Sequence, residues 1–339
     1  MKVDKYNNSI LASMAYLVIL IAGLKAGSNL IVPLLMAFFW FLLFLPLIDK
    51  LRSFGMLDIF TTIIVFGITL GIVALMGTFL VISGQDMIAN LPVYQERYYE
   101  LLPKVAVFFE KFGITMERSY IENLFDPIQI INYMATFLKE MGGIMTDGLL
   151  TLFIVLFLFL ESSLLSKKVL YLAKRKDAKK KIELFLHNVN TYFLTKTAIS
   201  ILTGLLIYAI LAFVGLDNAP LFGFLAFLLN YIPNIGSIMA AIPAILVSLL
   251  LLTITETVFI VTGYILVNSV IGNILEPKLL SRGVGLSTLV VFLSMVFWGW
   301  VFGPVGMFLS VPLTTVMKIG CDDSLNLKWA SVLLGDKIK

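Results

Sequence analysis

The stretch Pro233-Asn234-Ile235-Gly236-Ser237 breaks an apolar segment that runs from Leu221 to Leu252. Gly303-Pro304-Val305-Gly306 breaks a second one, from Leu286 to Val316. Each half is shorter than the ~20 residues that a helix needs to cross a bilayer. A break at membrane depth leaves backbone groups that hydrocarbon cannot satisfy, so it must be buried in protein or line a wet cavity. Paired broken segments of this kind point to a transport site.

The composition places the chain among membrane proteins. Hydrophobic residues make up 60% of the 339 residues and charged residues 14%, whereas soluble domains average about 45–50% and about 25%. We therefore predict an all-α polytopic membrane protein, with about six full transmembrane helices and two inverted re-entrant helical hairpins. The full spans are expected at about 9–26, 28–48, 59–82, 148–165, 197–215 and 257–275.

The basic residues set the predicted orientation, because loops rich in Lys and Arg stay in the cytoplasm. Lys50 and Arg52 follow the second span, and the loop 167–196 carries nine Lys and Arg against Asp177 and Glu183. Working outward from these loops places both termini in the cytoplasm of a multi-pass protein of the bacterial inner membrane. The first span shows no cleavage pattern and is expected to be retained.

On this topology, the last third of the chain repeats one arrangement in opposite orientations. Each copy is a span followed by a re-entrant hairpin, which indicates an inverted repeat. The alternatives are that each broken segment forms two tilted full spans, or that the second forms one kinked span. The expected divisions are 1–83 (three spans), 84–147 (external), 148–166 (fourth span), 167–196 (basic helix), 197–256 and 257–317 (span plus hairpin each), and 318–339 (cytoplasmic tail).

The two long loops have opposite charge. The segment 84–147 carries nine acidic and five basic residues, and its apolar residues between Leu91 and Phe109 recur at helical spacing, so it is predicted to form external amphipathic helices. The loop 167–196 is predicted to be a cytoplasmic amphipathic helix. Its alternative role is binding to anionic lipid headgroups.

No enzyme or metal site is visible in the sequence. A G-x-x-x-x-G-K-[ST] motif is absent, and the single histidine (His187) and single cysteine (Cys321) have no partner pattern for metal binding or nucleophilic catalysis. We therefore expect a protein that is not an enzyme, without a cofactor or a bound metal. The net charge of +4 gives no reason to expect nucleic-acid binding.

Polar and helix-breaking residues inside the apolar zone are the candidates for the solute path. Burying an unpaired polar group costs free energy, so such residues need a partner or a function. Neutral amides and hydroxyls suit a small hydroxylated solute, and they equally suit hydrogen bonds between helices. The candidates are Asn230, Pro233, Asn234, Gly236, Ser237, Asn268, Asn273, Gly303, Pro304, Gly306 and Ser310.

Glu276 is the candidate for a gate or for ion coupling. It lies in Glu276-Pro277-Lys278, where the sixth span meets the cytoplasm. A helix end with an interfacial ion pair is the structural alternative.

Several of these motifs resemble those of the autoinducer-2 exporter family of bacterial membrane proteins. They are Asn230-Tyr231-Ile232-Pro233-Asn234-Ile235-Gly236-Ser237, Asn273-Ile274-Leu275-Glu276-Pro277-Lys278, Gly285-Leu286-Ser287-Thr288, Phe297-Trp298-Gly299-Trp300 and Gly303-Pro304-Val305-Gly306. The resemblance implies export of the quorum-sensing signal autoinducer-2 and a homo-oligomer. Some members are described instead as sodium(lithium)/proton antiporters, with a tip motif Pro-x-x-Gly-Pro. Here Ser237 replaces the last proline, which favours the exporter branch.

The sequence thus predicts a transporter that exports a small polar signalling molecule, most simply autoinducer-2, through a site between two hairpin tips. Its expected partners are the solute, membrane lipids, other copies of the chain, and Na⁺ or H⁺ as a coupling ion. The alternatives are sodium(lithium)/proton antiport and a lipid-binding membrane scaffold without transport.

Overall fold

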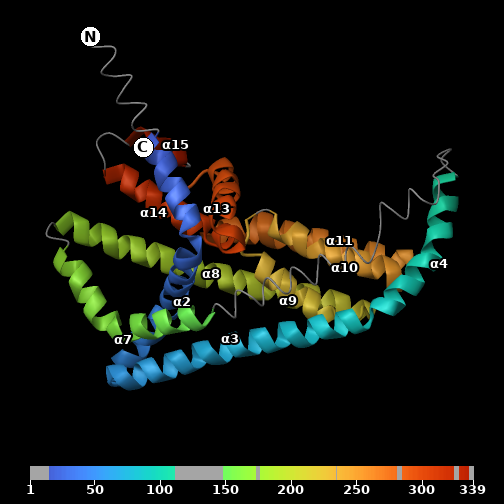
Figure 1. Ribbon diagram of the computed structural model, residues 1–339, viewed down its shortest axis with the longest axis horizontal. Helices are drawn as coiled ribbons and strands as arrows, with labels where there is room; N and C mark the ends of the chain where they lie inside the picture. Colours follow the sequence, from blue (N-terminus) through green and yellow to red (C-terminus); the bar gives the residue numbers. More distant parts are fainter. Residues whose placement is uncertain are drawn as a thin grey trace, which may run out of the picture. The chain divides into compact units, whose positions relative to one another are not determined.

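A computed structural model describes residues 15–110, 148–172, 176–233, 235–280, 285–323 and 328–335 (Figure 1). Apart from an isolated bridge between Leu286 and Gly335, all the regular structure in these residues is helical. The prediction of an all-α polytopic membrane protein is confirmed. Six helices are long and apolar enough to span a bilayer: Ser28–Ser53, Asp58–Ala89, Gly148–Leu165, Leu186–Val214, Ile254–Leu275 and Thr288–Phe308.

The first expected span, 9–26, is described only from its middle, where Ala15–Ala26 is helical. The elements that follow are α2 (Ser28–Ser53), α3 (Asp58–Ala89), α4 (Leu91–Glu110), α7 (Gly148–Leu172), α8 (Lys176–Val214), α9 (Ala219–Leu229), α10 (Gly236–Leu251), α11 (Ile254–Val270), the π-helical turn η1 (Ile271–Leu275), α12 (Glu276–Leu280), α13 (Thr288–Phe308), α14 (Ser310–Asp323) and α15 (Lys328–Leu334).

The chain forms two compact units, which are described separately. The first holds residues 1–66, 148–193 and 282–339, and the second holds residues 67–147 and 194–281. Both α3 and α8 run from one unit into the other. Each unit contains one of the two broken segments.

In the first unit, α2 packs along α7 and also contacts α13. Aromatic rings fill the α2–α7 contact, where the centroids of Phe41 and Phe159 are 6.3 Å apart. At the end of α2, Arg52 donates to Asp58 at the start of α3 (2.7 Å) and to the Ser162 hydroxyl on α7 (2.6 Å). Asp58 also suits the positive end of the α3 dipole. Arg52 therefore joins three helices where the sequence predicts a cytoplasmic loop.

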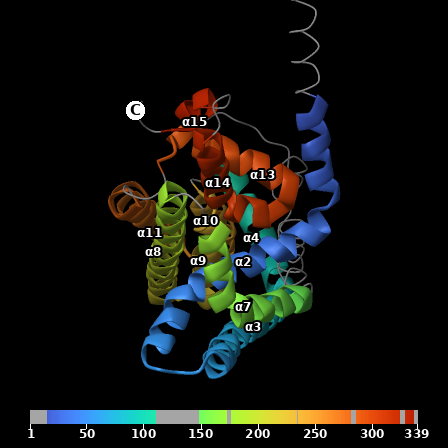
Figure 2. The ribbon, with the colours of Figure 1, turned by 90° about the vertical axis from the view of Figure 1, so that its left-hand side faces the viewer.

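The second broken segment forms a helical hairpin in this unit. α13 and α14 pack on each other, and α15 packs on α14 (Figure 2). The rings of Trp298 and Phe302 stack at 5.5 Å within α13, and Val301 completes a buried cluster with them. A backbone hydrogen bond from Ser287 to Leu334, at 3.2 Å, ties the start of the hairpin to α15.

The second unit is built around the first broken segment. α9 packs on α10, α10 on α11, and α4 on α10 (Figure 1). α4 buries Tyr94, Tyr98 and Leu102, one helical turn apart, which matches the helical spacing found in the sequence. The Tyr94 hydroxyl accepts a hydrogen bond from Asn218 at 3.4 Å, and burial raises the pKa of Tyr94. Residues 111–147, the rest of the predicted external segment, lie outside the described residues.

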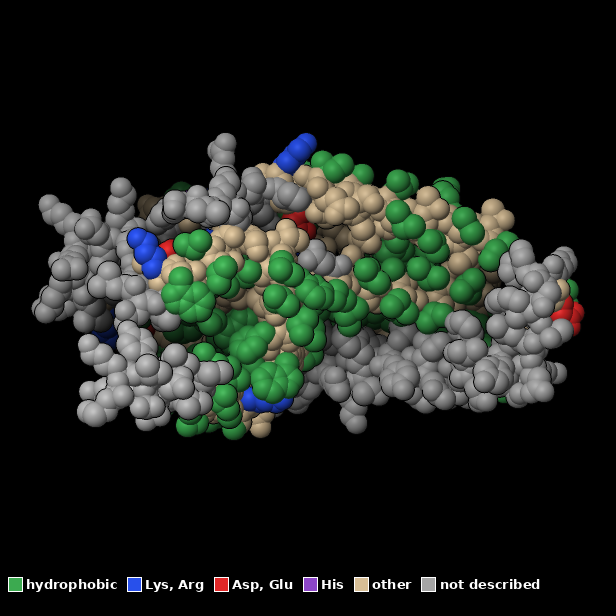
Figure 3. Space-filling view, turned by 90° about the horizontal axis from the view of Figure 1, so that it is seen from above, with side chains coloured by type: hydrophobic (Ala, Val, Ile, Leu, Met, Phe, Trp, Pro, Cys, Tyr) green, Lys and Arg blue, Asp and Glu red, His purple; other side chains and the backbone are tan. Residues whose placement is uncertain are grey.

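The surface is apolar, as lipid contact requires. Hydrophobic side chains dominate the described part of the face drawn in Figure 3. Large apolar residues such as Leu75 and Phe213 are 73% and 82% exposed. Contiguous exposure on this scale marks a membrane or an interaction surface in a folded chain.

Candidate solute site at the first hairpin

The first break lies where the sequence places it, between α9 and α10. α9 has 11 residues and α10 has 16, so each is too short to span a bilayer. A methyl group on Gly236, the first residue of α10, would overlap the carbonyl of Leu229 at the end of α9. The chain can turn back this closely because residue 236 has no side chain.

Two residues of this turn make hydrogen bonds to α8. The Asn230 amide donates to the Ser200 hydroxyl at 2.9 Å, and the Tyr231 hydroxyl donates to Thr197 at 2.7 Å. Asn230, Tyr231 and Ser200 are buried. The tip of the first hairpin therefore meets α8 through neutral polar groups that act as both donors and acceptors.

A buried lysine on the same helix forms an ion pair with a residue of α12. Lys196, one residue before Thr197, donates to the carboxylate of Glu276 at the start of α12. The Lys196 side chain is 3% exposed and that of Glu276 22%. A charge inside a membrane protein is costly and marks a functional site by default. We call the six residues Lys196, Thr197, Ser200, Asn230, Tyr231 and Glu276 the tip cluster.

The backbone before Glu276 departs from regular α-helix. α11 continues into the π-helical turn η1, and α12 begins at Glu276. π-helical turns inside α-helices occur frequently at functional sites. At the opposite end of α11, Thr253 and Glu256 form a reciprocal capping box. Glu256 thus has a structural role, whereas Glu276 is directed to a buried cation.

The second break also lies at the predicted residues, but its chemistry differs. Gly303 has φ 66° and ψ −150°, a conformation that glycine permits, and it bends α13 just before Pro304. A methyl group on Gly306 would overlap the carbonyl of Trp298. The Trp298 indole donates to Thr314 on α14 at 3.0 Å. The buried hydroxyl of Ser310 has no hydrogen-bond partner among the described residues.

Comparison with known proteins identifies the family. The AI-2E family transporter model matches residues 14–326. The chain belongs to the AI-2E family of transporters.

Three relatives are similar over almost their whole lengths. The AI-2 transport protein TqsA of Escherichia coli (strain K12) is 36% identical, over 96% of this chain and 95% of its own. A putative transport protein of Haemophilus influenzae is 33% identical over 96% of both chains. The putative transport protein YhhT of Escherichia coli (strain K12) is 32% identical, over 98% of this chain and 95% of its own. This AI-2E chain is accordingly a multi-pass membrane transporter.

The structure of this AI-2E transporter brings some predicted residues together and leaves others apart. Asn230 and Glu276 belong to the tip cluster, and Gly236, Gly303 and Gly306 form the two turns. Asn234 lies outside the described residues. The other candidates lie outside the cluster. Pro233, Ser237 and Asn268 are half-buried, Asn273 and Pro304 are exposed, and Ser310 is buried at the second break.

Sequence reasoning missed three members of the cluster on α8. By its charge Lys196 belongs to the basic loop 167–196, and Thr197 and Ser200 are small polar residues with no motif around them. The signal was present: Lys196 is followed by a long apolar run, and Ser200 lies four residues later on the same helical face.

Among the described residues, no group of three or more His, Cys, Asp or Glu could hold a metal.

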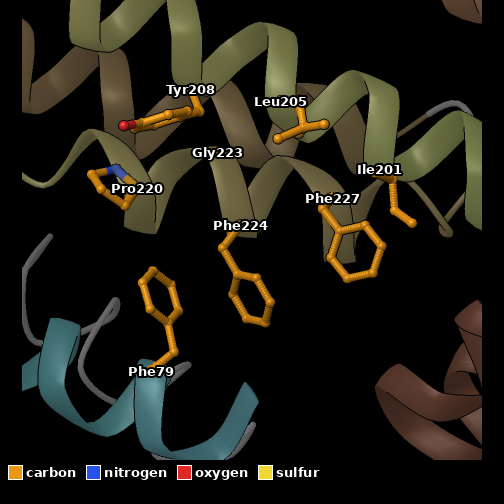
Figure 4. Close-up of a pocket in the computed structure, with 9 residues that line it drawn as sticks. Phe79, Ile201, Leu205, Tyr208, Pro220, Gly223, Phe224 and Phe227 are labelled. Carbon is orange, nitrogen blue, oxygen red and sulfur yellow. The ribbon is translucent and has the colours of Figure 1, made fainter. Parts of the chain in front are cut away.

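An apolar cavity of about 370 Å³ lies beside the tip cluster in this unit of the AI-2E transporter (Figure 4). Gly204 on α8 and Gly223 on α9 let the two helices cross closely, since a methyl group on Gly204 would come within 2.7 Å of the Gly223 carbonyl. The rings of Phe79 and Phe224, with centroids 5.1 Å apart, meet edge to face in its wall. These aromatic walls suit a hydrocarbon, so the tip cluster is the better candidate for a polar solute.

Proposed function

We propose that this transporter exports a small polar signalling molecule, with autoinducer-2 as the first candidate. The family supports transport, and a relative at 36% identity is named an AI-2 transport protein. The observation that carries the proposal is the tip cluster, in which Asn230 and Tyr231 meet Ser200 and Thr197 through neutral hydrogen bonds.

These hydrogen bonds are suited to exchange with a hydroxylated solute. An amide and three hydroxyls donate and accept without net charge, so a solute hydroxyl can replace either partner of a pair. Such a replacement leaves no buried polar group unsatisfied, which would otherwise cost about 1–3 kcal/mol. Opening the contact between the turn and α8 therefore costs little when the solute is present.

The test is efflux of labelled autoinducer-2 from proteoliposomes that contain the purified protein. We expect protein-dependent efflux, and we expect Asn230→Ala and Ser200→Ala to slow it. The matched control is Ser248→Ala, because Ser248 is also a buried serine in this unit, but its hydroxyl donates to the Ile245 carbonyl of its own helix. Absence of efflux from liposomes that contain correctly folded protein would refute the export proposal.

Sodium(lithium)/proton antiport is the second candidate function. Antiport needs an ionisable group in the membrane, and the carboxylate of Glu276 is such a group. Lys196 already occupies the carboxylate as a fixed cation. A sodium ion would have to compete with a tethered ammonium, which weighs against this function. Proton flux driven by sodium in the same liposomes, abolished in Glu276→Gln, would favour antiport.

A lipid-binding scaffold without transport fits less well. That hypothesis assigned the basic residues of 167–196 to the headgroup surface. Lys196 is instead buried and paired, and a scaffold has no need for two glycine-dependent turns in apolar segments.

A further inference from the structure

We propose that Lys196 and Glu276 form a proton-carrying pair that couples solute movement at the first hairpin to a proton gradient. This inference rests on the proposed export function and adds an energy source to it. Neither residue is needed for the turn itself, which Gly236 makes possible. Their position beside Thr197 and Ser200 on α8 brings a titratable pair next to the neutral groups of the tip cluster.

The pair differs in burial from three other ion pairs among the described residues. In the pairs Arg52–Asp58, Arg97–Glu100 and Lys168–Glu161, the carboxylate side chains are 53–59% exposed. Exposed pairs contribute little to stability and tolerate loss of either partner. The buried ammonium of Lys196 depends on its carboxylate, because an unpaired charge in a low-dielectric site is strongly disfavoured.

The two partners also differ in their access to water. Glu276 is about one-fifth exposed, whereas Lys196 is almost fully enclosed. Glu276 on α12 faces Lys196, and the neutral Thr197 and Ser200 follow Lys196 within the next four residues of α8; Lys278, also on α12, is exposed. The protonation state of Glu276 therefore determines whether Lys196 has a counter-ion.

One turnover then moves one proton. Glu276 takes a proton from water, and the ion pair is lost. Lys196 is then a buried cation without a counter-ion. It releases its proton toward the neutral groups of the tip cluster, where the solute would bind. When the proton on Glu276 passes to Lys196, the carboxylate and the ammonium are restored. One proton has entered at Glu276, one has left from Lys196, and no other reactant is consumed.

Solute movement is linked to this cycle through α8. The ion pair holds α12 against Lys196, and the two neutral hydrogen bonds hold the hairpin turn against Thr197 and Ser200, all within five residues of one helix. Loss of the ion pair releases α12 from α8. The hairpin turn is then the remaining attachment beside the groups that would bind the solute. Opening of the hairpin contact is therefore easier in the protonated state.

The decisive variant is Lys196→Arg. Arginine keeps the positive charge and can pair with Glu276, but it does not release its proton in proteins. A purely structural ion pair would survive this change, whereas a proton-carrying pair would not. Proteoliposomes that hold labelled autoinducer-2 and a trapped pH indicator report efflux and internal pH together. We expect a pH gradient that is acidic on the Glu276 side to accelerate efflux in the parent protein. This acceleration should be lost in Lys196→Arg.

A second variant covers the possibility that arginine does not fit. Lys196→Met with Glu276→Gln removes both charges, which is generally better tolerated than removing one. It should fold, as judged by a single symmetrical size-exclusion peak, and should lose the gradient dependence. The matched control is Lys168→Met with Glu161→Gln, which removes an exposed pair and should keep that dependence.

The possible failures are distinguishable. Efflux from the parent protein that ignores the pH gradient, or coupling that survives in either folded pair variant, overturns the proton-pair inference and leaves the export proposal standing. If the folded parent protein shows neither efflux nor solute-dependent proton movement, both proposals are wrong.

Discussion

The first hairpin turns at Gly236 and the second at Gly303–Gly306. In each, a methyl group on a tip glycine would overlap a main-chain carbonyl seven or eight residues earlier, that of Leu229 or Trp298. Beyond the turn they differ. The first tip hydrogen-bonds outward, from Asn230 and Tyr231 to α8. The second bonds inward, from Trp298 to Thr314 within the hairpin. The comparison indicates that a shared backbone turn can carry either a polar, titratable site or a closed aromatic one.

The largest expected effect concerns the ion pair beside the first hairpin, whose lysine is buried. Glu276→Gln leaves Lys196 buried without a counter-ion and should lower the free energy of unfolding by about 3–5 kcal/mol. Adding Lys196→Met should recover most of that loss, because both charges are then gone. Thermal unfolding in detergent measures both. If the single and the double variants unfold at the same temperature as the parent protein, Lys196 is not buried as described.

The next effect should be equal in the two hairpins. Gly236→Ala and Gly306→Ala each place a methyl group onto a backbone carbonyl, and overpacking of this kind costs about 1–3 kcal/mol or more. Gly71→Ala is the control, since nothing lies within 4 Å of its added methyl group and alanine is the better helix former. Expression level and thermal unfolding are the measurements. Tolerance of alanine at one tip but not the other would break the structural equivalence.

A smaller effect should separate the two tips by function. Asn230→Ala and Trp298→Phe each remove one donor from a buried hydrogen bond, so each should cost about 1 kcal/mol in stability. Only Asn230→Ala should slow autoinducer-2 efflux, because the Trp298 bond lies within its own hairpin. Equal slowing by both variants would show that the second tip also handles the solute.

The sequence predicted the turns better than it predicted the site. Gly and Pro in the middle of apolar runs locate both turns to within a residue or two, because few other residues allow such a bend. The tip cluster needs contacts between residues far apart in the chain, such as Lys196 with Glu276, and a single sequence gives no sign of which helices meet. From sequence alone Lys196 is indistinguishable from its basic neighbours, and Asn268 and Asn273 stand out only by their polarity.

The orientation of the two hairpins is the remaining part of the comparison, and it can be tested with little disturbance to the protein. In a Cys321→Ser background, single cysteines at positions 235 and 305 lie at the two turns. In an inverted repeat, the two hairpins enter the membrane from opposite sides. Ile235→Cys should thus react with an impermeant maleimide added outside in at least one state, and Val305→Cys with reagent added inside. Val305 is buried, so its labelling should be slower than that of Ile235→Cys. Labelling of both cysteines from one side alone would contradict the inverted arrangement and would favour tilted full spans, while leaving the chemical difference between the two tips intact.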